Sequence, residues 1–228
     1  MTKGSPVYIP LHFVSPGSNG QDYDVVEPID PIKEGTAGVG HVNVEFDSDG
    51  VVRRAMLCFA PDDKGSIWPH IVEQVWRAGA KPSPAYRRND NCDGSVLIPY
   101  SMRGGFAEIS FADLLAGEVP TDLVKGRDVI IGATATGLGD AYPVPFGDGG
   151  LLSGAEIMAN MLAAVKRDNF VEPLPSYATT ALSLLPVWLL LIGFLRWRPR
   201  FALTVSLLAV ATVLATSALL LGSQLWFP

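Results

Sequence analysis

The chain has 228 residues, of which 48% are hydrophobic, and a formal net charge of −6 at pH 7. Residues 1–176 contain all 23 acidic side chains but 14 of the 17 basic ones, so this part carries a net charge of −9. Recognition of nucleic acid starts from a basic patch, so we expect no nucleic acid as a partner. The same 176 residues are enough for one well-buried soluble core.

The first firm pattern in the chain is a β-hairpin. Residues 1–37 are rich in Pro, Gly and Asp and are predicted to be loops, with one short strand at 6–13. In residues 41–46 polar and apolar side chains alternate, which is typical of a half-buried strand. A turn signal at 47–50 connects this strand to a second one, predicted at 51–59.

Residues 66–79 are predicted to form an amphipathic helix, with Pro69 in its first turn and His70 and Glu73 on its polar face. The run from His70 also begins like an inverted zinc-protease motif, but Gln74 stands where the second histidine must be. With three histidines in the chain, a catalytic zinc site is poorly supplied. The preceding turn fails as a calcium loop, because a methionine occupies the position of the bidentate glutamate. We therefore predict no metal site.

The following elements indicate an α/β fold. A short strand at 96–100 and a capped helix at 110–117 precede a continuous apolar run at 128–133, which predicts a central strand covered on both faces. A Gly-rich loop at 134–153 and a helix at 154–167 follow, and this order forms half of a doubly wound unit. We expect a mixed or mostly parallel central sheet with flanking helices.

The Gly-rich loop is the candidate ligand-binding site, because open α/β sheets bind ligands where loops leave the carboxyl ends of central strands. Backbone amides, Thr134 and Thr136 could hold a small anion or polar group, and Asp140 and Glu156 could contact a cation or hydroxyl groups. Leu138 stands where the lysine of a nucleotide-binding loop belongs. An equally good explanation of the glycines is that they permit tight turns.

No motif predicts catalysis. The glycines around Ser153 have the wrong spacing for a nucleophile elbow, and Ser153 is expected to cap the following helix. The chain is therefore not expected to be an enzyme or to carry a cofactor. Cys58 and Cys92 are the only cysteines, and their spacing leaves two possibilities: a disulfide, or two thiols with Cys58 packed as a small hydrophobe.

The C-terminal part is predicted to span a membrane twice. Residues 177–195 and 201–221 contain no charged side chain, and each stretch is long enough to cross the lipid bilayer. The three arginines in residues 196–200 place this connection in the cytoplasm by the positive-inside rule, so residues 1–176 are expected outside it. Because no secretion signal precedes residues 1–176, we expect the chain to be part of a longer protein.

Four sequence blocks, in this order, resemble the second type of CHASE domain, the cyclase- and histidine-kinase-associated extracellular sensory domain. They are Gly40–Asn43 with Asp47–Arg54, Gly94–Tyr100, Val129–Ala135 with Gly139 and Asp140, and Gly154–Glu156 with Ala159 and Asn160. The resemblance divides the chain into a loop-rich N-terminal segment of the sensor (1–37), a CHASE-like domain (38–172), transmembrane helices (177–195 and 201–221) and a cytoplasmic loop (196–200). Met158 stands where the family is expected to have histidine in many members.

The resemblance implies an N-terminally incomplete, extracytoplasmic ligand-sensing domain of a membrane-bound signalling protein, such as an adenylate or guanylate cyclase or a sensor kinase. We expect an integral protein of the bacterial inner membrane that binds an unknown small molecule or ion and is a homodimer in the intact receptor. Two alternatives are a membrane-anchored α/β hydrolase-like enzyme with Asp140 and Glu156 as an acid–base pair, and a stand-alone membrane scaffold protein.

Overall fold

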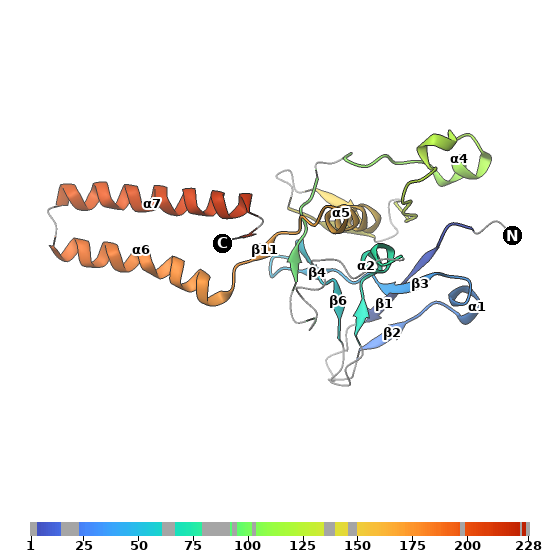
Figure 1. Cartoon of the computed structure of the whole chain (residues 1–228), viewed down its shortest axis with the longest axis horizontal. Coiled ribbons are helices and arrows are strands. Elements are labelled where there is room, and N and C mark those ends of the chain that lie inside the picture. Colours follow the sequence, from blue (N-terminus) through green and yellow to red (C-terminus); the bar gives the residue numbers. More distant parts are fainter. Residues whose placement is uncertain are drawn as a thin grey trace. The chain divides into compact units, whose positions relative to one another are not determined.

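The computed structural model describes residues 4–14, 23–60, 67–78, 92, 95–101, 104–134, 140–145, 150–196, 199–223 and 225–226. The chain divides into two compact units, residues 1–170 and residues 171–228, which we call the head and the hairpin unit. The head contains small sheets and short helices, whereas the hairpin unit consists mainly of two long helices (Figure 1).

The strands of the head form several small sheets instead of one. The sheets are β2-β1-β3 (Asp24–Val26, Tyr8–Val14, Gly38–His41), β4-β5-β8 (Glu45–Phe46, Val52–Ala55, Val96–Leu97), β6-β7 (Cys58–Phe59, Trp68–Pro69) and β9-β10 (Ala141–Pro143, Leu151–Ser153). Among the described residues of the head, only β1 and β3 pair in parallel as neighbouring strands. The prediction of an α/β fold is confirmed, but the prediction of a mixed or mostly parallel central sheet is wrong.

The predicted β-hairpin is present as β4 and β5, joined by a turn in which Gly50 has φ +78°. Two aspartates of this turn form ion pairs with arginines of β5. Arg53 contacts Asp47 and Asp49 at 2.9 and 2.8 Å, and Arg54 Nε contacts Asp47 at 3.0 Å. The turn acids therefore hold the hairpin together, which gives them a role other than binding a cation.

The predicted central strand at 128–133 is wrong. These residues form no strand in the structure, and Val129, Ile130 and Ile131 are 52%, 39% and 71% exposed. A short apolar run predicts a buried strand only if other strands flank it, and none of the described strands pairs with this segment. The segment instead runs beside helix α5 (Gly154–Arg167), where Lys166 forms an ion pair with Asp128.

The shorter helices agree with prediction to different degrees. Helix α4 (Phe111–Ala116) has the expected Ser110 cap and ends at Gly117 with φ +74°. Helix α2 (Ile71–Trp76) is shorter than predicted, because Pro69 belongs to β7 and His70 is the N-cap residue. Helix α1 (Asp30–Lys33) and the 3₁₀ turn Thr121–Leu123 were not predicted.

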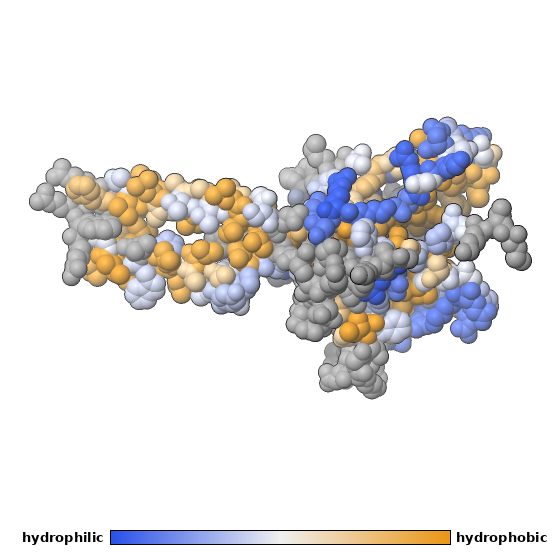
Figure 2. Space-filling model, in the orientation of Figure 1, coloured by the Kyte–Doolittle hydropathy of each residue, from blue (hydrophilic) through white to orange (hydrophobic). Residues whose placement is uncertain are grey.

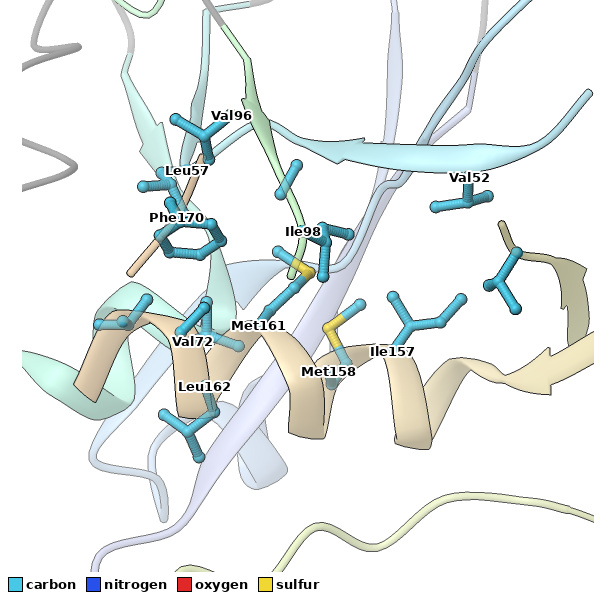
Figure 3. Close-up of a cluster of buried hydrophobic side chains, with 14 of the residues drawn as sticks. Val52, Leu57, Val72, Val96, Ile98, Ile157, Met158, Met161, Leu162 and Phe170 are labelled. Atoms are coloured by element: carbon cyan, nitrogen blue, oxygen red, sulfur yellow. The ribbon is translucent and has the colours of Figure 1, made fainter. Parts of the chain in front are cut away.

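Helix α5 organises the hydrophobic core of the head, as its pattern predicted. Its buried residues are Ile157, Met158, Asn160, Met161, Leu162, Ala164 and Val165. They pack against buried side chains from the strands and the residues next to them, from α2 and from the end of the head, namely Val52, Leu57, Val72, Val96, Ile98 and Phe170 (Figure 3). Each fully buried side chain of this kind contributes about 1.5–3 kcal/mol relative to exposure, so α5 fixes the surrounding elements in place.

The hairpin unit contains the two predicted apolar helices, α6 (Ser176–Arg196) and α7 (Pro199–Gly222). Both are long and apolar enough to cross a membrane, with mean hydropathies of 2.0 and 2.2 over their best spans. On the face shown in Figure 2, hydrophobic side chains lie along both helices with some of intermediate hydropathy between them, whereas the most hydrophilic side chains lie on the head. The chain then returns, because β12 (Leu225–Trp226) after α7 pairs in parallel with β11 (Glu172–Pro173) before α6.

Candidate functional site

The predicted ligand site lies around the first turn of α5, and Asp140 reaches this turn. A Cβ atom at position 154 would be 2.5 Å from Asp140 Oδ1, so glycine at this position allows the carboxylate to approach the start of the helix. The N-terminus of a helix carries a partial positive charge, which stabilises a nearby carboxylate. Asp140 is therefore held where the Gly-rich loop returns to the helix.

Glu156 lies in the same turn and closes a capping box with Ser153. Glu156 Oε2 accepts hydrogen bonds from Ser153 N at 3.2 Å and from Ser153 Oγ at 3.3 Å. In return, Ser153 Oγ accepts a hydrogen bond from Glu156 N at 3.2 Å. The predicted cap is confirmed, and it satisfies orphan donors at the helix start.

The segment just before the Gly-rich loop meets the same turn of α5. A Cβ atom at Gly132 would be 2.5 Å from Ala155 Cβ, so the backbone at this point passes directly over the helix. Thr134 follows two residues later and is exposed, whereas Thr136 lies outside the described residues. The structure thus brings Asp140, Glu156 and the segment that leads to Thr134 to one helix turn.

Tyr142 adds a hydroxyl group to this site. Burial raises the pKa of Tyr142, and the negative charge of Asp140 and a hydrogen bond to its carboxylate raise it further. The hydroxyl group therefore stays protonated and donates a hydrogen bond to the carboxylate of Asp140. Since a carboxylate already faces the start of α5, the described groups favour a cation or a hydroxylated ligand over an anion.

The Gly40–Asn43 block joins β1, β3 and α2. A Cβ atom at Gly40 would be only 2.7 Å from Ile71 Cα, so α2 can begin directly on β3 only if this residue is glycine. Asn43 continues the pairing of β3 with β1 through its side chain: Oδ1 accepts from Phe13 N at 2.9 Å, and Nδ2 donates to Phe13 O at 2.7 Å. Two residues of the block thus have distinct structural roles.

His41, another residue of the Gly40–Asn43 block, forms a buried pair with His70. Both side chains are 0% exposed, and their rings meet edge to face with centroids 4.8 Å apart. His70 Nδ1 accepts a hydrogen bond from Val72 N at 3.3 Å and caps α2. Among the described residues, both ring nitrogens of His41 and Nε2 of His70 have no hydrogen-bond partner.

Sequence reasoning missed the histidine pair, and the strand pattern even predicted the opposite face. The alternation at 41–46 places Phe46 inside and His41 outside, whereas Phe46 is 51% exposed and His41 is buried. The backbone leaves strand geometry between β3 and β4, so the two-residue period does not hold across this segment. The prediction of a polar helix face is also wrong, because His70 and Glu73 are both 0% exposed. The carboxylate of Glu73 instead accepts a hydrogen bond from Arg77 Nε at 3.0 Å.

The two cysteines form a disulfide, which decides between the two possibilities left by the sequence. Their Cα atoms are 5.4 Å apart, a usual separation for a disulfide. Cys58 is 1% exposed in β6, so the bond connects the core to Cys92, 34 residues later. Disulfides persist in oxidising compartments, which agrees with a head outside the cytoplasm.

In the part of the chain that the structure describes, no group of three or more His, Cys, Asp or Glu side chains could hold a metal ion.

Asn160, which belongs to the last block of the family resemblance, connects two parts of the head through hydrogen bonds. Its Oδ1 accepts from Ser101 N at 2.8 Å and from Ser101 Oγ at 2.9 Å, and its Nδ2 donates to Glu156 O at 2.9 Å. Asn160 therefore fixes the loop after β8 to α5.

Comparison with known proteins identifies the family. The model of the CHASE2 domain matches residues 4–197, so the chain belongs to the CHASE2 family. CHASE2 domains are extracellular sensory domains, usually found in signalling proteins, and are not catalytic. No curated protein and no solved structure is significantly similar to the chain.

Proposed function

We propose that the chain is the extracytoplasmic sensor and membrane anchor of a signalling protein of the bacterial inner membrane, whose output is an adenylate or guanylate cyclase or a sensor kinase. The observation that carries this proposal is the direct connection of a CHASE2 head to two apolar helices of membrane-spanning length, joined at residues 196–200 by an arginine-rich loop. The disulfide of the head supports the same orientation.

The orientation can be tested by labelling three engineered cysteines with a membrane-impermeant maleimide. Ser48→Cys in the β4–β5 turn and Ser223→Cys after α7 are expected to react in intact spheroplasts. Arg198→Cys is expected to react only after the membrane is permeabilised. The native cysteines are paired and give the unlabelled background. The reverse pattern would place the head in the cytoplasm and overturn the proposed function.

We propose that the ligand site is formed by Thr134, Thr136, Asp140 and Glu156 and that the ligand is a cation or a small hydroxylated molecule. The support is that Asp140 and Glu156 converge on one turn of α5. The melting temperature of the full chain in lipid nanodiscs should rise when an organic ammonium ion or a small sugar is added at millimolar concentration, and Asp140→Asn should abolish the rise. If no probe stabilises the wild-type chain, the site assignment is wrong for these ligands.

The enzyme and scaffold alternatives make different predictions from the sensor. Acid–base catalysis requires one of the two carboxyl groups to gain a proton and the other to lose one during turnover. Ligand binding requires only that Glu156 and Asp140 use their remaining lone pairs beside the hydrogen bonds from Ser153 and Tyr142. Sequencing the DNA on both sides of the reading frame would separate the remaining cases. A downstream cyclase or kinase in frame supports the sensor, and an independent gene with no output domain supports a scaffold.

Cross-linking in native membranes would test the expected homodimer.

A further inference from the structure

We propose that external acidity is a stimulus of this sensor: protonation of His41 or His70 cannot be accommodated in the closed head and separates β3 from the start of α2. This proposal rests on the proposed function, because it requires that the head faces the medium outside the cytoplasm. Its structural basis is the histidine pair, defined by the two buried rings whose centroids lie 4.8 Å apart.

The surroundings of the histidine pair are aromatic. The ring of Phe13 on β1 and the ring of Phe59 on β6 each lie 6.1 Å from the ring of His41, centroid to centroid. Phe13 also contacts Trp68 of β7 at 5.8 Å. An imidazolium here would lose its hydration, and these rings would supply no full negative charge in return.

The charged groups on the neighbouring elements do not compensate for a protonated pair. On α2, Glu73 is already paired with Arg77. On β1, His12 is exposed, and on β6 the disulfide does not titrate. On β2, Asp24 is exposed, and Tyr23, just before this strand, meets Phe59 edge to face. Protonation of both contacting imidazoles would destabilise the closed head further, because two positive charges would repel each other.

The protonation equilibria follow from this geometry. Burial lowers the pKa of His41 to about 4. Burial also lowers the pKa of His70 well below its usual value, and the charge of a protonated His41 lowers it further. Both imidazoles are therefore neutral in the closed head, whereas opened or unfolded histidines bind protons below pH of about 6.5. The stability from keeping the pair buried is complete above about pH 6.5 and falls as the pH drops toward 4.

The expected size of the effect is measurable. With a pKa near 6.5 in the open state and about 4 in the closed state, His41 alone raises the opening equilibrium constant about 30-fold between pH 8 and pH 5. The opening has a defined location, since His41 lies on β3 and His70 caps α2. Because α2 and α5 share the hydrophobic core through Val72 and Met161, a displaced α2 changes the packing of α5.

The test is native-state hydrogen exchange of the full chain in nanodiscs, measured at pH values between 8 and 5 and corrected for the intrinsic pH dependence of exchange. In the wild-type chain, protection of α2 and β3 should fall by about 30-fold or more on acidification. His41→Gln combined with His70→Asn should remove most of this loss, because neither amide side chain titrates and asparagine can still cap the helix. His12→Asn, at an exposed position, should behave as wild type. Equal acid sensitivity in the wild type and in the His41→Gln, His70→Asn double variant would overturn the proposal.

A second measurement does not depend on any variant. The chain has three histidines, so ring ¹³C labelling gives three signals that can be followed by NMR. The two buried rings should stay neutral well below pH 6.5 and change only together with opening of α2. Titration of all three rings near pH 6.5 in a closed head would contradict the proposal. Acid opening combined with a cytoplasmic labelling pattern would instead retain the histidine mechanism and refute the proposed function.

Discussion

Helices α5 and α7 both consist largely of apolar residues but cover them in different ways. Half of the 14 residues of α5 are buried within the head, and its charged side chains lie at its two ends. None of the most apolar span of α7 is buried within the structure, although its mean hydropathy is 2.2. A helix with one apolar face is covered by protein, whereas a helix that is apolar on all sides needs a hydrocarbon solvent. The comparison indicates that the head and the hairpin unit are stabilised by different environments and can be perturbed separately.

The largest expected effect concerns the disulfide, which belongs to the head alone. Replacing Cys58 and Cys92 by serine should lower the free energy of unfolding of the head by about 4 kcal/mol, because the open chain regains the entropy of a loop of 34 residues. Chemical denaturation in nanodiscs would measure the loss, and the helicity of α6 and α7 should persist. Reduction of the wild-type chain should reproduce the effect, and reduction of the double variant should change nothing. An unchanged denaturation midpoint would show that the bond does not constrain the head.

Core packing on α5 should give the next largest effect. Ile157→Ala should destabilise the head by about 3 kcal/mol, because the side chain is 0% exposed and leaves a cavity. Leu214→Ala in α7 removes a side chain of similar size that is 65% exposed, and it should leave the head unchanged. Thermal denaturation of both variants would measure the difference. Equal losses in the two variants would mean that the head and the hairpin unit do not unfold separately.

A charge in the middle of α7 tests whether this helix lies in the hydrocarbon core of a membrane. Val210→Arg should disfavour membrane insertion by about 2.5–3.5 kcal/mol, the cost of an arginine at the centre of a bilayer. An insertion assay that compares this variant with Leu115→Arg, at an exposed position of α4, would measure it. Normal insertion of the α7 variant would contradict the assignment of this helix to the membrane.

The smallest effect is expected at the cap of α5. Ser153→Ala removes the acceptor of the Glu156 backbone N–H and should cost about 1 kcal/mol of head stability. Ser153→Asp keeps an acceptor at this position and should recover most of the loss. If alanine and aspartate behave alike, the capping box contributes little to the head.

The sequence predicted elements whose signals are local. The Ser153 cap of α5, the β4–β5 turn, the caps of α4 and both apolar helices depend on neighbouring residues, and all were confirmed. The exposed run at 128–133 and the short α2 were missed, because their outcome depends on which distant strands lie beside them.

The candidate site shows the same limit. Asp140 and Glu156 were proposed from a loop and a helix start, and the structure places both at one turn of α5. The histidine pair joins residues 29 positions apart in the chain, and its burial comes from close packing of β3 on α2 at Gly40. No local pattern contains this contact, although the Gly40–Asn43 block marked one side of it.

The pairing of β11 with β12 has a mechanical consequence for the hairpin unit. It ties the strand before α6 to the strand after α7, so the two helices form a loop that is closed at its base. A force applied at residue 171 therefore acts on the bases of both helices. Neither helix can slide lengthwise without breaking these backbone hydrogen bonds. Such a base favours tilting or rotation of the helix pair as one lever over a piston movement of α6 alone.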